Sequence, residues 1–265
     1  MKMMTIASGS SGNSTLIQSD SSAVLIDCGI SKKRIEEALS SVDMSLYDID
    51  GIFITHEHTD HVSAVGVIAR TYGLKMYATE ETIRAISRIK SLGNFDRSLF
   101  TAIDPMKSVQ VGDLSVRAYP VWHDAADPVC YTVTDGHRKV SVATDMGDYD
   151  DGLVREISGS DAMVIETNHD IRMLQVGRYS YDLKQRILGK RGHLSNEAGG
   201  RLIRSVLNNH IRAIFLGHLS KDNNLPELAY EAVKYELNGN PYSSDVRDFN
   251  ISVAPRDTAG PLITI

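Results

Sequence analysis

The chain has 265 residues, of which 42% are hydrophobic and 23% charged, as is ordinary for a soluble globular protein. It has no apolar run as long as a membrane span, and its N-terminus does not resemble a secretory signal. We therefore expect a cytoplasmic protein with a single domain over residues 1–265 and no membrane contact. Cys28 and Cys130 form no CxxC pair, which favours two buried thiols.

The net charge of −6 argues against nucleic-acid binding when taken alone, but the charge is unevenly distributed. Residues 172–212 contain nine Lys or Arg and two acids, a local charge of +7, so the rest of the chain carries −13. Such a segment suits a phosphate-bearing substrate, and its adjacent cations Lys190 and Arg191 are candidate substrate-binding residues. Solvated helices with exposed basic side chains are the alternative, and charge alone does not decide between the two.

The N-terminal segment predicts short strands around a loop rich in glycine and serine. The strands are expected near residues 3–7, 16–17 and 23–26, and the loop covers residues 8–14. Backbone N–H groups and hydroxyls of such a loop can bind phosphate, or the loop is only a flexible hairpin. Ser10 and Asn13 are its candidate substrate-binding residues. Asp27 closes the third strand and precedes a predicted helix over residues 31–39.

Three histidines and one aspartate lie at a predicted strand-to-helix junction: His56, His58, Asp60 and His61. Residues 51–54 read as a buried strand, and residues 62–69 suit a packed helix. If the extended strand carries through, the imidazoles of His56 and His58 point to one side. Imidazole and carboxylate together suit Zn²⁺, Mn²⁺ or Fe²⁺. The alternative is a group of polar residues at a helix N-terminus, with Asp60 as the cap.

Three more imidazole or carboxylate side chains follow predicted strands. His123 follows a hairpin strand, Asp145 follows the strand at residues 139–143, and His218 follows the strand at residues 213–216. A carboxylate at the C-terminal end of a strand, beside a glycine turn, is well placed to bridge two metal ions.

The motif Thr-His-Glu-His-Thr-Asp-His at residues 55–61 resembles the His-x-His-x-Asp-His signature of the metallo-β-lactamase superfamily. The resemblance extends over nearly the whole chain and implies an α/β fold, the four-layer αββα sandwich, with a dinuclear metal centre. It implies one metal ion held by His56, His58 and His123, a second held by Asp60, His61 and His218, and Asp145 as the bridge. Asp27 matches the carboxylate that orients the ligands from behind.

Two further motifs resemble the YycJ/WalJ group of this superfamily: Ser-Gly-Ser-Ser-Gly-Asn at residues 8–13 and His-Asp-Ala at residues 123–125. That resemblance implies a cytosolic 5′-to-3′ exonuclease acting on DNA, commonly with Mn²⁺. We expect two divalent ions per chain, Mn²⁺ or Zn²⁺, and the nitrogen and oxygen ligands also admit Fe²⁺. The polarity and the preference for DNA come from the resemblance alone. The oligomeric state is not predicted.

The tetrapeptide Gly-His-Leu-Ser occurs twice, around His193 and around His218. The first copy resembles a loop of tRNase Z, in which a Glu/His pair protonates the leaving oxygen. Glu166 and His193 match that pair, but residues 167–169 depart from the tRNase Z pattern, so His193 and His169 both stay candidate partners of Glu166. Asn168 and His169 are also candidate substrate-binding residues.

Together these residues favour metal-assisted hydrolysis of a phosphodiester, with His193 and Glu166 as the acid pair and Asp60 orienting the attacking hydroxide. A thioesterase resembling glyoxalase II would use the same seven ligands without needing that acid, because a thiolate leaves easily. An RNA-processing nuclease is a further alternative. A flavodiiron-type oxidoreductase is disfavoured, because it usually has Glu where this chain has His58. A non-catalytic nucleic-acid-binding module is also disfavoured, because it would not need all seven ligands.

Overall fold

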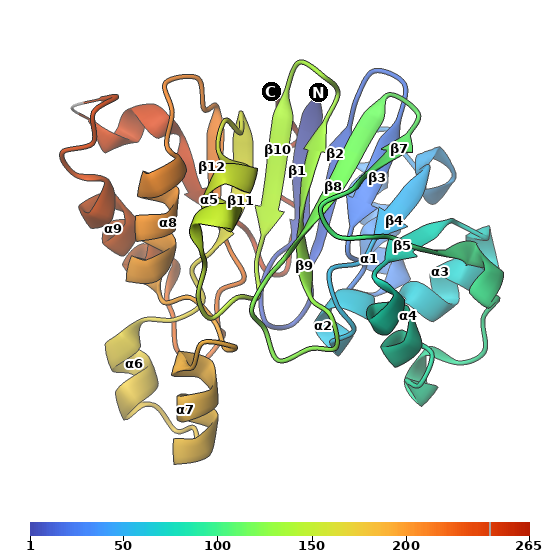
Figure 1. The fold of residues 1–265 in the computed structure, drawn as a ribbon, viewed down its shortest axis with the longest axis horizontal. Helices are drawn as coiled ribbons and strands as arrows, with labels where there is room; N and C mark the ends of the chain where they lie inside the picture. Colours follow the sequence, from blue (N-terminus) through green and yellow to red (C-terminus); the bar gives the residue numbers. More distant parts are fainter. Residues whose placement is uncertain (244) are drawn as a thin grey trace. The chain divides into compact units, whose positions relative to one another are not determined.

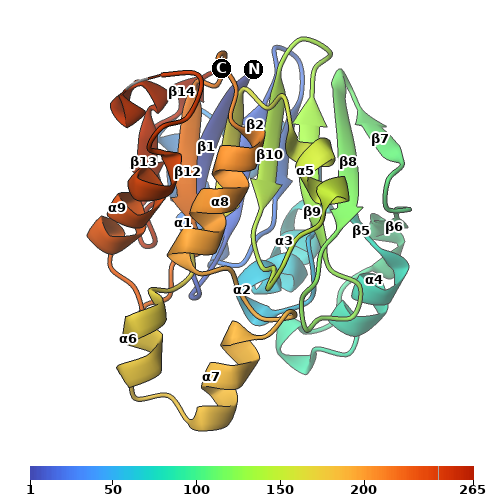
Figure 2. The ribbon, with the colours of Figure 1, turned by 60° about the vertical axis from the view of Figure 1, so that its left-hand side comes forward.

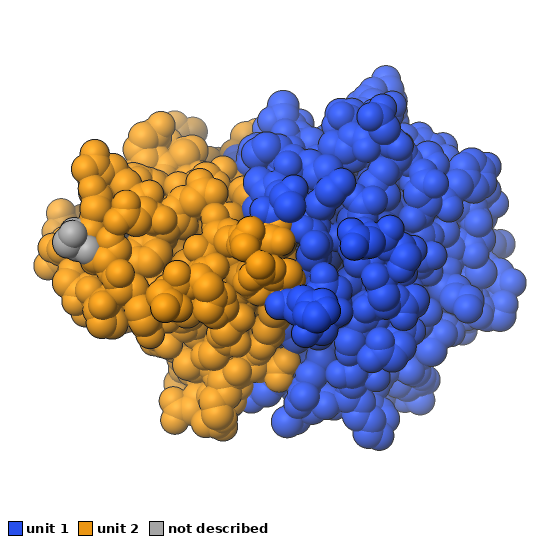
Figure 3. All heavy atoms as spheres, turned by 90° about the horizontal axis from the view of Figure 1, so that it is seen from above, with its two compact units in different colours: residues 1–120, 125–137, 255–264 blue, residues 121–124, 138–254, 265 orange. Residues whose placement is uncertain are grey.

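The computed structural model describes residues 1–243 and 245–265, which form two compact units (Figure 3). Unit 1 comprises residues 1–120, 125–137 and 255–264, coloured blue, and unit 2 comprises residues 121–124, 138–254 and 265, coloured orange. The expectation of a single domain stays a prediction. No helix in the described part of the chain is both long enough and apolar enough to cross a membrane.

A sheet of seven strands, counted over the described residues, is the centre of unit 1 (Figure 1). In spatial order the strands are β14 (Ile263–Thr264), β1 (Lys2–Ala7), β2 (Ser14–Gln18), β3 (Ala23–Ile26), β4 (Gly51–Phe53), β5 (Met76–Ala78) and β6 (Phe100–Ala102). β1 pairs antiparallel with β14 and β2, and β2 pairs antiparallel with β3. From β3 to β6 the strands are parallel, so the loops that follow β3 and β4 leave the same edge of the sheet.

Unit 1 also contains three antiparallel strands, β7 (Ser108–Val111), β8 (Leu114–Pro120) and β9 (Val129–Thr134). The turn between β7 and β8 places Gly112 in the left-handed region at φ +58°. Helices of this unit pack on the seven-stranded sheet: α1 (Lys32–Ser40), α3 (Val65–Tyr72) and α4 (Glu80–Ile86), with Ile35, Ile68 and Ile86 in one hydrophobic core with sheet residues. The 3₁₀ turns are η1 (Leu46–Asp48), η2 (Lys90–Leu92) and η3 (Arg97–Leu99).

The continuous helix predicted over residues 62–69 is wrong. α2 (Thr59–Val62) ends before α3 begins at Val65. The Asp60 carbonyl accepts a hydrogen bond from the Asn13 backbone at 2.8 Å, and the Ala64 N–H donates to Cys28 at 3.0 Å. These long-range bonds replace the i→i−4 bond that would continue the helix.

Unit 2 is built on parallel strands, β10 (Lys139–Ala143), β11 (Ala162–Glu166), β12 (Ala213–Gly217) and β13 (Ile251–Val253). Three helices pack on one face of these strands: α5 (Asp151–Ile157), α8 (Asn196–Val206) and α9 (Pro226–Leu237) (Figure 2). α6 (Ile171–Val176) and α7 (Tyr181–Leu188) extend beyond the strand ends (Figures 1 and 2). The last turn is η4 (Val246–Phe249), and β13 and β14 each end a sheet.

Candidate metal centre

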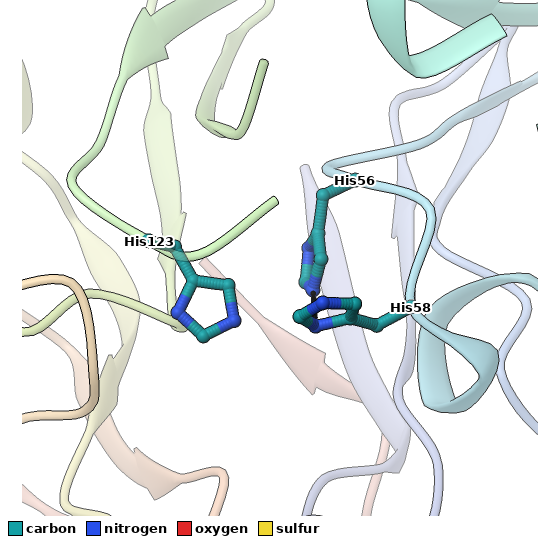
Figure 4. Close-up of side chains that lie close together, drawn as sticks. All are labelled: His56, His58 and His123. Carbon is teal, nitrogen blue, oxygen red and sulfur yellow. Dashed lines mark hydrogen bonds between the residues drawn. The ribbon is translucent and has the colours of Figure 1, made fainter. Parts of the chain in front are cut away.

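The loop that follows β4 carries the histidine-rich motif of unit 1 (Figure 4). β4 ends at Phe53, so the strand does not continue to His56, and the alternation argument does not apply. The loop nevertheless turns the rings together. Nε2 of His56 lies 3.0 Å from Nδ1 of His58, and the ring centroids of His56 and His61 are 4.1 Å apart. Divalent metal ions are bound by imidazole nitrogens that converge in this way.

Asp27, at the end of β3, holds this loop from behind. Its Oδ2 lies 2.7 Å from Nδ1 of His61, and its two oxygens accept hydrogen bonds from the N–H and the hydroxyl of Thr55 at 2.8 and 2.9 Å. Burial raises the pKa of Asp27, and the bonds from His61 and Thr55 oppose that shift. A proton on Nδ1 of His61 satisfies the carboxylate and leaves Nε2 to bind a metal ion.

We expect Asp27→Asn to lower metal affinity about 10- to 100-fold, because the amide cannot hold His61 in the same tautomer. Isothermal titration with Mn²⁺ or Zn²⁺ measures this. Asp43→Asn is the matched control, since Asp43 is an exposed aspartate with the same left-handed backbone, φ +58° against +62° for Asp27. An affinity within twofold of the parent protein would remove Asp27 from the metal site.

The turn after β3 and the N-terminal loop both pack against the histidine-rich loop that follows β4, here called the metal loop. A Cβ on Gly29 would lie 1.6 Å from the Asp60 carbonyl oxygen, so only glycine fits there. The Asn13 side chain is 6% exposed, and its Nδ2 lies 3.3 Å from the Asp60 carbonyl oxygen and 3.0 Å from Nε2 of His61. Asn13 thus contacts the metal loop, whereas Ser10 is exposed. A substrate contact by either residue stays a prediction.

A second cluster lies at the C-terminal edge of the unit 2 strands. Asp145, Glu166, His193 and His218 each offer one ligand atom, and these atoms lie within 4.8 Å of one another. Oδ1 of Asp145 is 3.4 Å from Nε2 of His218 and 3.7 Å from Nε2 of His123. His123 Nδ1 donates to the Gly192 carbonyl at 3.0 Å, which leaves its Nε2 for a metal ion.

Glu166 is fully buried and contacts two histidines. Its Oε1 lies 2.7 Å from Nδ1 of His193 and 3.1 Å from Nδ1 of His218. Burial alone would raise the pKa of Glu166, but the two imidazoles outweigh it and lower the pKa to about 2. The contact with His218 was not predicted. It follows from the parallel pairing of β11 and β12, whose register sets Glu166 beside Gly217.

Of the two predicted partners of Glu166, His193 makes the hydrogen bond. His169 is 1% exposed, and burial lowers its pKa to about 4, so its ring is neutral at pH 7. Asn168 is 4% exposed and donates through Nδ2 to the His218 carbonyl at 2.9 Å. Asn168 therefore holds the loop that carries His218, and a substrate contact by Asn168 or His169 stays a prediction.

Three of the predicted site residues have a backbone conformation that is uncommon outside glycine. Asp27, Asp145 and His218 have φ of +62°, +60° and +55°, and they are three of the six non-glycine residues with positive φ in the described part of the chain. Asp27 and His218 directly follow the last residue of a strand, and Asp145 lies two residues beyond the end of β10. Such strain persists where the surrounding structure fixes the residue, and it concentrates at functional sites.

The basic segment lies on α6, α7, α8 and their connections in unit 2. Some of its cations serve the fold: Arg186 pairs with Asp124, and Arg201 pairs with Glu236 of α9 at 3.3 Å. Lys190 and Arg191 are exposed, and Nε of Arg191 donates to the His123 carbonyl at 3.1 Å. These two cations therefore belong to the surface beside a ligand loop.

Comparison with known proteins identifies the family. The model of the β-lactamase superfamily domain matches residues 22–218. Exodeoxyribonuclease WalJ of Streptococcus pneumoniae serotype 2 (strain D39) is 39% identical over 264 residues, which cover 100% of this chain and 98% of WalJ. This chain belongs to the WalJ/YycJ family. Exodeoxyribonuclease YycJ of Bacillus anthracis is 38% identical over 234 residues, covering 88% of this chain and 87% of YycJ.

Solved structures show the fold of this WalJ/YycJ family member. The metallo-β-lactamase fold protein YhfI of Bacillus subtilis matches with a TM-score of 0.70 at 16% identity, covering 98% of both chains. The predicted metallo-β-lactamase fold class is thereby confirmed. The candidate ligands in both units are imidazoles and carboxylates, a donor set that fits divalent ions such as Zn²⁺ and Mn²⁺. This WalJ/YycJ member is accordingly a metal-dependent hydrolase.

Proposed function

We propose that this protein is a 5′-to-3′ exonuclease that hydrolyses phosphodiester bonds of DNA. The observation that carries the proposal is the 2.7 Å hydrogen bond between Glu166 and His193 beside the ligand pair Asp145 and His218. The leaving oxygen of a phosphodiester is a poor leaving group and needs a proton, whereas a thiolate does not. The full-length similarity to two exodeoxyribonucleases supports DNA as the substrate. The polarity rests on the family resemblance.

We assign the metal ligands as the resemblance implies: His56, His58 and His123 for one ion, Asp60, His61 and His218 for the other, and Asp145 as the bridge. Mn²⁺ or Zn²⁺ suits these ligands, and Fe²⁺ is compatible with them. When bound, the two cations supply Lewis-acid activation of water and neutralise charge on the reacting phosphate. The number and identity of the ions are part of the proposal.

The side chains of the chain itself orient water and move one proton. Asp60 orients the attacking water. His193, whose side chain is 20% exposed, holds a proton on Nε2 and donates it to the leaving oxygen. The ionised Glu166 accepts the Nδ1–H of His193 and fixes the orientation of the imidazole.

A substrate panel tests the proposal. End-labelled DNA, end-labelled RNA and S-lactoylglutathione are each incubated with the protein and Mn²⁺ or Zn²⁺. We expect mononucleotides to be released from DNA, beginning at the 5′ end. Faster release from RNA would favour the RNA-processing alternative. Turnover of the thioester alone would overturn the nuclease assignment.

Reversing the charge of Lys190 and Arg191 is expected to weaken DNA binding and to flatten its salt dependence. Each lost phosphate contact lowers the slope of log Kd against log salt by about 0.7–0.9. Fluorescence anisotropy with a phosphorothioate oligonucleotide measures the slope. The matched control reverses the charge of another pair of neighbouring lysines, Lys32→Glu and Lys33→Glu in α1, and should leave the slope unchanged. A slope equal to that of the parent protein in the Lys190→Glu, Arg191→Glu variant would mean that these cations contact solvent and not the phosphates.

A further inference from the structure

The single tryptophan of the chain, Trp122, lies at the surface next to a candidate metal ligand. It is 45% exposed, although its neighbours Val121 and His123 are 8% and 1% exposed. The Trp122 carbonyl accepts the Gly147 N–H at 3.0 Å, and the next residue, His123, is held by Gly192 through its ring. The indole therefore projects from a fixed backbone. Half of this large apolar side chain is left in water, so packing alone does not explain it.

The backbone at residues 189–192, which carries two exposed cations of the basic segment, Lys190 and Arg191, lies against the same part of unit 2. A Cβ on Gly147 would lie 2.5 Å from the Lys190 carbonyl carbon and 2.5 Å from the Gly192 nitrogen, so residues 189–192 lie directly on Gly147. Arg191 donates to the His123 carbonyl at 3.1 Å. The backbone at His123 in unit 2 is thus flanked by Trp122, Lys190 and Arg191.

We propose that Trp122 is a stacking platform for an unpaired base of the substrate, while Lys190 and Arg191 bind the phosphates of the same strand. The inference rests on the proposed exonuclease function and names the residues that hold the strand being degraded. An aromatic face beside cations is how proteins hold a single strand without reading its sequence. A base inside a duplex is already stacked on its neighbours, so the platform takes a base at the strand end that has separated from its partner.

Because the chain has one tryptophan, its fluorescence reports on the platform directly. The metal-loaded protein is titrated with a single-stranded phosphorothioate oligonucleotide. We expect saturable quenching of tryptophan emission. By anisotropy of a labelled strand, Trp122→Ala should raise Kd about tenfold, whereas Trp122→Phe should retain most of the affinity. The matched control is Tyr235→Ala, which removes a 79% exposed aromatic from α9 and should leave Kd unchanged. Circular dichroism and metal content verify each variant.

Single abasic substitutions along the oligonucleotide locate the stacked base. With the parent protein, one or two positions should lose affinity by about tenfold, and in Trp122→Ala those positions should no longer matter. If Trp122→Ala binds every oligonucleotide as the parent does, or if no quenching occurs, the platform is overturned while DNA hydrolysis by the parent still supports the exonuclease. If the parent neither binds nor cleaves DNA, the exonuclease proposal fails, and the platform fails with it.

Discussion

Replacing Asp145 is expected to release metal and to lower phosphodiester hydrolysis by about 10³-fold or more, because the proposed bridge contributes to both ions. Asp145→Asn is the sharper variant, since asparagine has the same shape and tolerates the left-handed backbone at φ +60°. His58→Ala tests the ligands of unit 1 in the same way. Metal content by plasma mass spectrometry and turnover of labelled DNA are measured together.

The control for this pair of variants is Asp148→Asn, three residues beyond Asp145 and bonded to the N–H of Tyr149 at 2.9 Å. Thermal melts should show that all variants fold, because the ligands follow the strands and do not form their core. About two ions per chain and normal turnover in both Asp145→Asn and His58→Ala would show that the ligand assignment is incorrect.

His193→Ala is expected to keep both metal ions but to slow DNA hydrolysis about 10²- to 10⁴-fold, since it removes only the proton for the leaving oxygen. Bis(p-nitrophenyl) phosphate has a leaving group that needs no proton, so its hydrolysis should be nearly normal in this variant. His218→Ala should lose metal and should not be rescued. The exposed fractions agree with these roles, 20% for the His193 side chain and 2% for His218.

The opposite pattern would reverse the two assignments. If His193→Ala lost one ion while His218→Ala kept both, the first copy of Gly-His-Leu-Ser would be the ligand loop. Equal slowing of DNA and of the nitrophenyl diester in His193→Ala would show that His193 does more than donate a proton.

The local sequence pattern was enough to locate most strands and the candidate site residues that follow them. The strand ends before Asp145 and His218 were predicted because short apolar runs end there at glycine turns. The helix break after Val62 was not predictable, because it depends on hydrogen bonds from Asn13 and to Cys28, which are distant in sequence.

Contacts between strands could not be predicted from the sequence pattern, because they too join residues that are distant in sequence. Glu166 was identified as a partner for one histidine, but its second contact, with His218, depends on β11 and β12 being parallel neighbours in a given register. The burial of Asn168 and His169 also depends on residues distant in sequence, because the Asn168 N–H donates to the Leu194 carbonyl and the His169 carbonyl accepts the Asn196 N–H.

The shared oxygen of Glu166 constrains how this protein can evolve. One carboxylate holds both the proton donor and a metal ligand, through bonds of 2.7 and 3.1 Å to His193 and His218. A substitution at position 166 therefore alters two functions in one step, and the losses from mutations at these three positions will not be additive. A lineage that exchanged its leaving-group acid would also need a new partner for Nδ1 of His218. We therefore expect Glu166, His193 and His218 to be inherited as a unit, because no single substitution leads from this arrangement to another.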